Sequence, residues 1–186
     1  MNNLIGKFIE LKTINNSHAE LVVKWRNSDH AKFINKGSSN IEDQIKWINN
    51  RPDNEYNFII YFRDEAVGQI SLYNINKVHK TADAGRLILD KNLPKGYPIT
   101  FESILLIYSF AFYKLNLNKI SGLVASSNIG AIKLNDFVKM RREGILRQQF
   151  IFDNGFQDAI VFGILKNEFI EIQEPFLKKI INLNLK

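Results

Sequence analysis

The sequence predicts a single α/β domain on a mixed, mostly antiparallel sheet of six to seven strands, flanked by helices and followed by an extra C-terminal helix. Strand-like and helix-like segments alternate along the chain, as in a sheet covered by helices. The 186 residues are enough for one domain with a sizeable core and short for two. Hydrophobic residues make up 45% and charged residues 24%, as in globular proteins.

The sequence pattern of the first half predicts one strand, then two helices, then three strands. A helix that Ser17 can cap carries Leu21 and Trp25 at helical spacing. A second amphipathic helix begins at Ile41 and stops before Pro52, which cannot continue it. The strands of this half are expected at Phe8–Leu11, Tyr56–Phe62, Val67–Ile75 and Ala82–Leu89, the last three as a meander.

The chain is organised around Asp83–Ala111, where the third strand of the meander leads through a turn into a helix. The turn contains Lys95, Gly96 and Tyr97, and the helix opens near Pro98. The first N–H groups of a helix have no internal partner, and the helix dipole favours negative charge there. This segment therefore predicts an anion site, with an ordinary strand–turn–helix joint as the alternative.

The second half continues with a strand, a helix and a terminal hairpin. The strand is expected at Lys119–Ala125 and the helix from Asn128 to about Lys139. The hairpin strands are Ile145–Phe152 and Phe156–Leu165, joined by the turn Asp153-Asn154-Gly155. The amphipathic tail is expected to be helical with a break near Pro175. We therefore expect residues 1–168 to form the domain and residues 169–186 a helical extension of it, which packs on the domain or on a second subunit.

Composition excludes several kinds of site. Without cysteine there is no disulfide, no thiolate catalysis and no cysteine–zinc site. His18, His30 and His79 are far apart and lack metal-ligand spacing. The longest apolar run, Ile104–Tyr113, is too short to span a bilayer. The N-terminus lacks the pattern of a secretory signal. These features predict a cytoplasmic protein without a metal.

The net charge of +6 allows two interpretations. The basic residues are scattered and do not interleave with aromatic side chains as an RNA-binding sheet would. A basic surface also suits a small ligand that carries phosphate. Nucleic-acid binding therefore rests on net charge alone, and a phosphate-bearing ligand is the preferred interpretation.

Two motifs are typical of a known family. The late segment SSNIGAIKLNDFVKMRREGILRQQFIFDNGFQDAIVFGILKNEF, together with the order of elements, resembles the GNAT superfamily of acetyl-CoA-dependent N-acyltransferases. The resemblance is to the branch that contains ribosomal-protein N-terminal and amino-sugar acetyltransferases. KWRN, at Lys24–Asn27, resembles nucleotide-sugar acetyltransferases of surface-glycan synthesis. The matching late positions are Asn128, Ala131, Ile132, Leu134, Glu143, Gly144, Arg147, Asn154, Gly155 and Asp158.

The resemblance implies an acetyl-CoA site between two splayed strands, 84–89 and 120–125. The cofactor pyrophosphate would rest on the turn and helix start, and the pantetheine arm would pair with the edge of the central strand. Asn128 would hydrogen-bond the pantetheine, although an Asn before a helix is also a good N-cap. The implied cofactor residues are Ile88, Leu89, Lys95, Gly96, Tyr97, Pro98, Ile99, Thr100, Asn128, Ala131 and Lys133.

Three departures from the family pattern bear on chemistry. Leu93 and Pro98 stand where the turn motif has Arg or Gln and a small residue, and proline lacks one phosphate donor. Asn135 replaces the tyrosine presumed to protonate the leaving thiolate, and an amide can only donate a hydrogen bond. Lys139-Met140 replaces the Gly-Phe that ends the helix. These departures also allow a degenerate member that binds acyl-CoA or a partner without catalysis.

The candidates for proton transfer are few. Asp83, on the strand that leads into the site, is a candidate base, with a solvated charge as the alternative. His30 could reach the acceptor pocket, or be an ordinary exposed histidine. Tyr73 and Tyr97 are candidates to replace the missing acid beside Asn135, unless they are packing residues.

Arg26 and Asn27 are the acceptor-side candidates, with Trp25 and Tyr73 beside them. An arginine fork suits a nucleotide-sugar phosphate, and the alternative is an ion pair with Asp29. Trp25 has helical spacing to aliphatic residues, which also fits core packing. The sequence therefore predicts acetyl transfer from acetyl-CoA directly to a primary amine, in particular that of a nucleotide-linked amino sugar. The alternative within the class is a protein N-terminus as acceptor, and a homodimer is compatible with the terminal helix.

Overall fold

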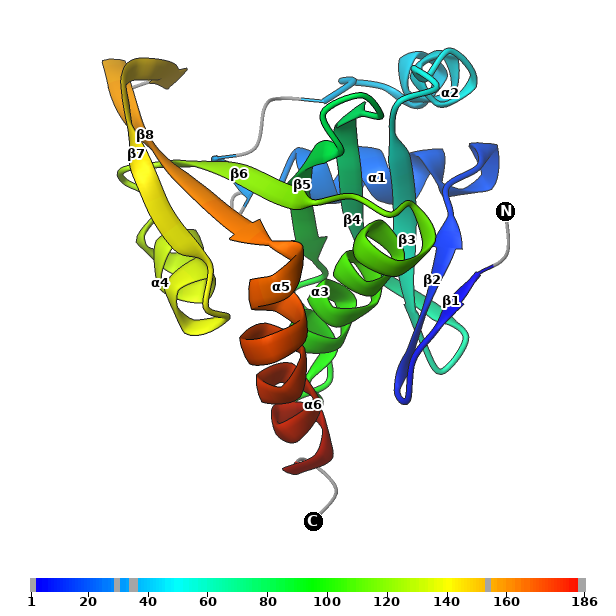
Figure 1. Ribbon diagram of the computed structural model, residues 1–186. Coiled ribbons are helices and arrows are strands. Elements are labelled where there is room, and N and C mark those ends of the chain that lie inside the picture. The colour runs from blue at the N-terminus through cyan, green and yellow to red at the C-terminus, as the bar shows by residue number, and fades with distance from the viewer. Residues whose placement is uncertain (1–2, 29–30, 34–36, 153–154, 184–186) are drawn as a thin grey trace.

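The computed structural model describes residues 3–28, 31–33, 37–152 and 155–183 (Figure 1). Within them, eight strands form one sheet in the order β1-β2-β3-β4-β5-β6-β8-β7. All neighbours pair antiparallel except β5 and β6, so the predicted mixed, mostly antiparallel sheet is confirmed. The strands are β1 (Leu4–Ile5), β2 (Ile9–Thr13), β3 (Tyr56–Phe62), β4 (Glu65–Asn76), β5 (Thr81–Leu89), β6 (Lys119–Ala125), β7 (Arg141–Phe152) and β8 (Gly155–Leu165).

Two strand predictions need correction. The expected six to seven strands become eight because β1, which is only two residues long, pairs with β2. β7 begins at Arg141 rather than at Ile145, because the polar residues Arg141 and Arg142 pair with Gly163 and Phe162 of β8. The predicted turn residues Asp153 and Asn154 lie outside the described part of the chain.

The helices follow the expected order. Their bounds are α1 (Ala19–Arg26), α2 (Ile41–Asn49), α3 (Ile99–Ser109), α4 (Ile129–Phe137), α5 (Lys166–Glu168) and α6 (Glu174–Leu183), with a 3-10 turn η1 (Asn16–His18) and two π-helical segments, η3 (Phe110–Lys114) and η4 (Phe169–Gln173). No described helix is long and apolar enough to cross a bilayer.

Two helix-end predictions are wrong. The first helical segment is capped by Asn15 instead of Ser17, because the Asn15 side chain accepts the backbone N–H of Ser17 at 3.0 Å. The expected break at Pro175 is absent, since Lys166–Leu183 is helical throughout and only its hydrogen-bond pattern changes at η4. Pro175 lies in the first turn of α6, where a proline is tolerated.

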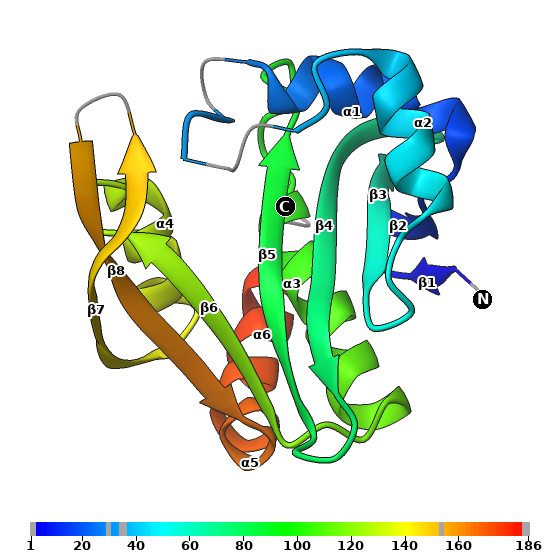
Figure 2. The ribbon, with the colours of Figure 1, turned by 90° about the horizontal axis from the view of Figure 1, so that it is seen from above.

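The helices cover the two faces of the sheet (Figure 2). In β3, Phe58 and Ile60 join the core under α3, whereas Ile59 belongs to the cluster under α1 and α2. This alternation is what a strand buried on both faces requires. α6 packs beside α3, so the C-terminal extension completes the main core through Leu177.

The side chain of Glu102 connects α3 to the hairpin formed by β1 and β2. Its side chain is only 2% exposed and accepts the backbone N–H groups of Lys7 and Phe8, the latter at 3.0 Å. A Cβ at Gly6 would lie 2.6 Å from the Glu102 carboxylate, so this approach requires glycine. Glu102 therefore fixes the start of α3 against the hairpin of β1 and β2.

The sheet divides between β5 and β6. Thr81–Asp83 pairs with Lys119–Ser121 in parallel, and beyond these three pairs the strands separate, as Figure 2 shows. β5 stays paired with β4, and β6 stays paired with β8. The separation implied by the family resemblance is thus present, and the site is built in it.

Candidate active site

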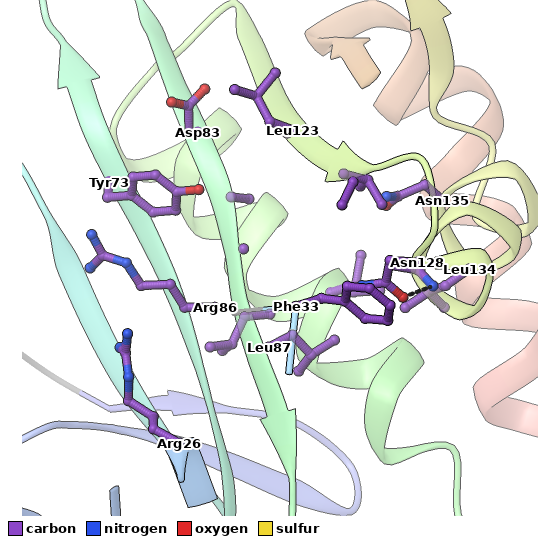
Figure 3. A pocket seen from close by; sticks show the side chains of 18 of the residues that line it. Arg26, Phe33, Tyr73, Asp83, Arg86, Leu87, Leu123, Asn128, Leu134 and Asn135 are labelled. Carbon is purple, nitrogen blue, oxygen red and sulfur yellow. Dashed lines mark hydrogen bonds between the residues drawn. The ribbon is translucent and has the colours of Figure 1, made fainter. Parts of the chain in front are cut away.

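A cavity of about 760 Å³ occupies the gap between β5 and β6 (Figure 3). Its walls are residues 84–87 of β5 and 122–125 of β6. The α1–α2 segment closes it on one face of the sheet, and α3 and α4 close it on the other. The remaining lining residues are Arg26, Phe33, Gly37, Ser38, Gln44, Trp47, Ile70, Tyr73, Asn74, Asp83, Ile104, Tyr108, Asn128, Gly130, Ala131, Leu134, Asn135, Met140 and Phe150.

The separated strand edges make the cavity suitable for an extended ligand. Where β5 and β6 no longer pair, each presents backbone donors and acceptors toward the gap. An extended chain with amide groups, such as a pantetheine arm, can pair with such an edge as an added strand does. A carbonyl placed there also meets backbone N–H groups that can stabilise an oxyanion.

Arg86, on β5, lines the side of the cavity that faces α1 and α2. Its Nη1 donates to Oε2 of Glu55 and to Oδ1 of Asn57, both at 3.1 Å, and the Glu55 side chain is only 6% exposed. The Arg86 guanidinium also lies 4.3 Å from the ring centroid of Tyr73. Among the described residues these hydrogen bonds use Nη1 alone, so Nε and Nη2 remain available to a ligand.

A second arginine shares this side of the cavity. Figure 3 shows Arg26, Arg86 and Tyr73 toward one side of β5, with Asn128, Leu134 and Asn135 toward the other. Burial lowers the pKa of Arg26, and the nearby positive charge of Arg86 lowers it further. Like charges confined in one cavity favour a bound anion.

Asp83 stands at the point where the two strands separate. It is the last β5 residue paired with β6, and its Oδ2 accepts the amide of Asn74 at 2.8 Å. Burial raises the pKa of Tyr73, and the negative charge of Asp83 raises it further. Asp83 and Tyr73 thus line the same part of the cavity, and their roles in proton transfer stay predictions.

On the opposite side, α4 begins at Asn128. Its side-chain oxygen accepts the backbone N–H of Ala131 at 3.1 Å, which makes Asn128 the N-cap of α4. Asn128 also lines the cavity, together with Ala131 and Asn135 from the same helix. The N-cap interpretation is therefore confirmed, and contact with a ligand stays a prediction. Lys133 is exposed on α4 and does not line the cavity.

The predicted turn and helix-start residues lie outside the cavity wall. The hydroxyl of Tyr97 accepts a hydrogen bond from Arg63 at 2.7 Å, and its ring packs on Phe62, so it does not face Asn135. Ile88 is buried in the cluster under α1 and α2. The other predicted residues away from the cavity lining are Leu89, Lys95, Gly96, Pro98, Ile99 and Thr100.

The start of α3 nevertheless retains the properties of an anion site. Gly96 has φ +88°, a conformation that favours glycine, and nothing lies within 4 Å of its missing Cβ. Among the described residues, the first backbone bond of this helix is Glu102 N–H to Pro98, so the preceding helical N–H groups are unpartnered. Binding of a pyrophosphate at this turn stays a prediction, with one backbone donor fewer because of Pro98.

Two predicted acceptor residues have structural roles, and one is not described. Trp25 is 2% exposed, and its indole N–H donates to Asp90 at 2.9 Å, so it is a core residue. The Asn27 amide donates to the Val23 carbonyl at 2.9 Å at the end of α1. His30 lies outside the described residues.

Sequence reasoning missed several lining residues. Arg86 had a signal, because a charged side chain interrupts the apolar strand ADAGRLIL. Tyr108 had one too, since its hydroxyl interrupts the apolar run of α3. Trp47 has helical spacing to aliphatic residues, which indicates core packing, and it lines the cavity from α2. Phe33 had no signal, because it reaches the cavity through tertiary packing.

Comparisons with known proteins agree on one family. Residues 9–136 match the Acetyltransferase (GNAT) domain. The chain is 24% identical to an uncharacterised N-acetyltransferase, p20, of Bacillus licheniformis, over 91% of this chain and 99% of that protein. It is 31% identical to a spermidine N(1)-acetyltransferase of Vibrio cholerae, over 58% of this chain and 61% of that protein.

Solved structures share the fold. A variant of the spermidine N-acetyltransferase from Vibrio cholerae superposes with a TM-score of 0.79 at 18% identity, covering 89% of this chain and 98% of that chain. A GCN5-related N-acetyltransferase from Brucella melitensis superposes with a TM-score of 0.79 at 16% identity, covering 98% of this chain and 84% of that chain.

Proposed function

This chain belongs to the GNAT acetyltransferase family, and we propose that its acceptor is a primary amine on a molecule that also carries phosphate, specifically a nucleotide-linked amino sugar. Family membership makes the chain an acetyl-CoA-dependent N-acetyltransferase. The acceptor, and a place in the amino-sugar branch of the family, are the new parts of this proposal.

The pair Arg26 and Arg86 carries the proposal. Both line the cavity on the α1–α2 side, and Arg86 keeps Nε and Nη2 for a ligand. Guanidinium groups bind phosphate oxygens through paired, charge-assisted hydrogen bonds. A polyamine such as spermidine would instead bring positive charge toward two guanidinium groups. The carboxylate of Glu55 offsets only part of this repulsion, because it is one negative charge beside two guanidinium groups.

The remaining site residues suit direct transfer. The amine nitrogen attacks the thioester carbonyl carbon, and the carbon–sulfur bond then breaks with its electron pair on sulfur. We propose that Asp83 accepts the proton that the amine loses, and that Tyr73 orients the amine beside it. The unpaired N–H groups of the separated strands stabilise the oxyanion. Acetyl-CoA supplies the acetyl group and the thiol leaving group.

The proposed acetyl-CoA residues divide into two groups. The turn and first turn of α3, residues 95–100, take the pyrophosphate on their free N–H groups. Asn128 and Ala131, which line the cavity at the start of α4, hold the pantetheine arm. The backbone of Ile88 and Leu89 continues the β5 edge beyond the cavity lining, and Lys133 is the outermost of these residues, on the exposed side of α4. Asn135 supplies a hydrogen bond in place of the family's tyrosine.

An acceptor panel tests the proposal. Coenzyme A release is measured with a nucleoside-diphosphate amino sugar, the same amino sugar without the nucleotide, spermidine, and a peptide with a free N-terminus. We expect the nucleotide-linked amine to have the highest kcat/KM, by at least about tenfold over the free amino sugar. A higher kcat/KM for spermidine or the peptide overturns the proposed acceptor and leaves the family assignment intact.

A further inference from the structure

Tyr108 places a buried hydroxyl in the wall of the cavity. The residue is on α3, is only 5% exposed, and lines the cavity together with Asn135 and Met140. Among the described residues, its hydroxyl makes a single hydrogen bond, to the thioether sulfur of Met140 at 3.3 Å. A thioether is a weak acceptor, so this buried donor is poorly satisfied.

The hydroxyl of Tyr108 lies next to the end of α4 that carries Asn135. Met140 connects the two, because its backbone N–H donates to the Asn135 carbonyl at 3.0 Å while its sulfur accepts from Tyr108. The Tyr108 ring is fixed by edge and tilted contacts with the rings of Phe112 and Phe169. The hydroxyl is therefore held in the cavity wall beside the helix position where the family has its tyrosine.

We propose that the Tyr108 hydroxyl donates a hydrogen bond to the coenzyme A sulfur as the thiolate leaves, and so supplies from α3 the stabilisation that Asn135 alone cannot complete from α4. This inference rests on acetyl-CoA-dependent transfer, and does not depend on which amine is the acceptor. Tyr108 is thereby a catalytic residue that touches the leaving atom.

The pKa values of the two groups favour a hydrogen bond from Tyr108 to the sulfur over transfer of its proton to the sulfur. Burial raises the pKa of the Tyr108 hydroxyl far above that of a thiol, which is about 8.5. The proton therefore stays on Tyr108 while the carbon–sulfur bond breaks and its electron pair remains on sulfur. The product leaves as the thiolate, and the amine proton goes to Asp83 as in the proposed function. A donor to an anionic sulfur makes a stronger bond than a donor to a neutral thioether, so the hydroxyl gains by leaving Met140.

The test uses Tyr108→Phe, which removes the hydroxyl and keeps the ring. The matched control is Tyr113→Phe in the adjacent η3 segment, because the Tyr113 hydroxyl donates to Glu174 outside the cavity. Coenzyme A is bound to each protein, its affinity is measured by calorimetry, and the pKa of its thiol is titrated by the ultraviolet absorbance of the thiolate. This readout needs no acceptor and no turnover.

We expect Tyr108→Phe to raise the pKa of the bound thiol by about one unit and to lower kcat about tenfold or more, with little change in KM for acetyl-CoA. Tyr113→Phe should change neither. Coenzyme A that binds both variants with the same thiol pKa overturns this inference. A wild-type protein that does not bind coenzyme A at all overturns the acetyltransferase assignment, and this inference with it.

A second variant guards against a folding defect in Tyr108→Phe. Met140→Leu removes the competing sulfur acceptor with little change in volume. It frees the Tyr108 hydroxyl for the ligand, so the pKa of the bound thiol should stay at or below the wild-type value. An increase in that pKa would contradict the role of Tyr108.

Discussion

Replacing Arg86 by Met should destabilise the protein, because it leaves the buried carboxylate of Glu55 without its ion-pair partner. Met keeps an unbranched aliphatic stem of similar length, so the change removes mainly the charge and the donors. The lost contacts are the 3.1 Å ion pair with Glu55, the bond to Asn57 and the stacking over Tyr73. Arg86 already has φ +53°, and Met meets the same backbone strain, so strain adds little.

The magnitude follows from the exposure of the two partners. Removing one member of a fully buried ion pair costs about 3–5 kcal/mol. The Glu55 side chain is 6% exposed, but that of Arg86 is 26% exposed, so solvent screens part of the pair. We expect Arg86→Met to lower the free energy of unfolding by about 2 kcal/mol and the melting midpoint by about 4–8 °C.

Urea unfolding in a double-mutant cycle is the assay, with Glu55→Gln and the double variant as the other corners. Neutralising Glu55 removes the charge that Arg86→Met strands, so the double variant should recover about 1–2 kcal/mol relative to the sum of the single losses. A loss below about 0.5 kcal/mol in Arg86→Met, or additive single effects, refutes the reasoning. The pair would then be a solvated contact, and Arg86 would not be held in place by Glu55.

Two further predictions concern stability. Glu102→Gln should cost about 2–4 kcal/mol in urea unfolding, because an amide has one acceptor oxygen for the N–H groups of Lys7 and Phe8; a loss under about 1 kcal/mol would contradict this account. Burial lowers the pKa of His18 below its ordinary 6.5, and its Nδ1 accepts the Asn15 N–H at 3.0 Å. The unfolded chain therefore protonates first, so stability should fall as pH drops through about 6.5, and this part of the slope should vanish in His18→Gln.

Much of the fold could be predicted because its signals are local. Alternation and turn residues predict the strands β3, β4 and β6. Helical spacing predicts that α2 begins at Ile41, and Pro52 explains why it ends where it does. Asn128 likewise acts as the N-cap that its position before an apolar helix indicates. One error occurs where two nearby residues, Asn15 and Ser17, are both suitable helix caps. Another occurs where pairing with β8 makes β7 longer than its sequence pattern indicates.

The site was predictable only in part, because its residues come together through the separation of two strands. Asp83 was selected from its place on a strand, and Asn135 and Arg26 from the family resemblance. Each lines the cavity, and their roles stay predictions. Tyr97 was not placed correctly, because its hydroxyl bonds to Arg63 across a loop that no motif reveals. The role of Arg86 requires Glu55, which is 31 residues away along the chain.

One backbone irregularity connects the position of Arg86 with the opening of the sheet. Between the pairs Gln69–Ile88 and Ser71–Gly85, β5 contains one residue more than β4, and Arg86 there has positive φ. Such a bulge bends its strand and increases the local twist, so β5 turns away from the path that pairing with β6 would require. It also interrupts the alternation of side chains, which allows four successive residues, 84–87, to line one cavity. The bulge thus bends β5 where it parts from β6 and places Arg86 in the cavity wall. The width of the gap and the position of this arginine therefore depend on the same extra residue.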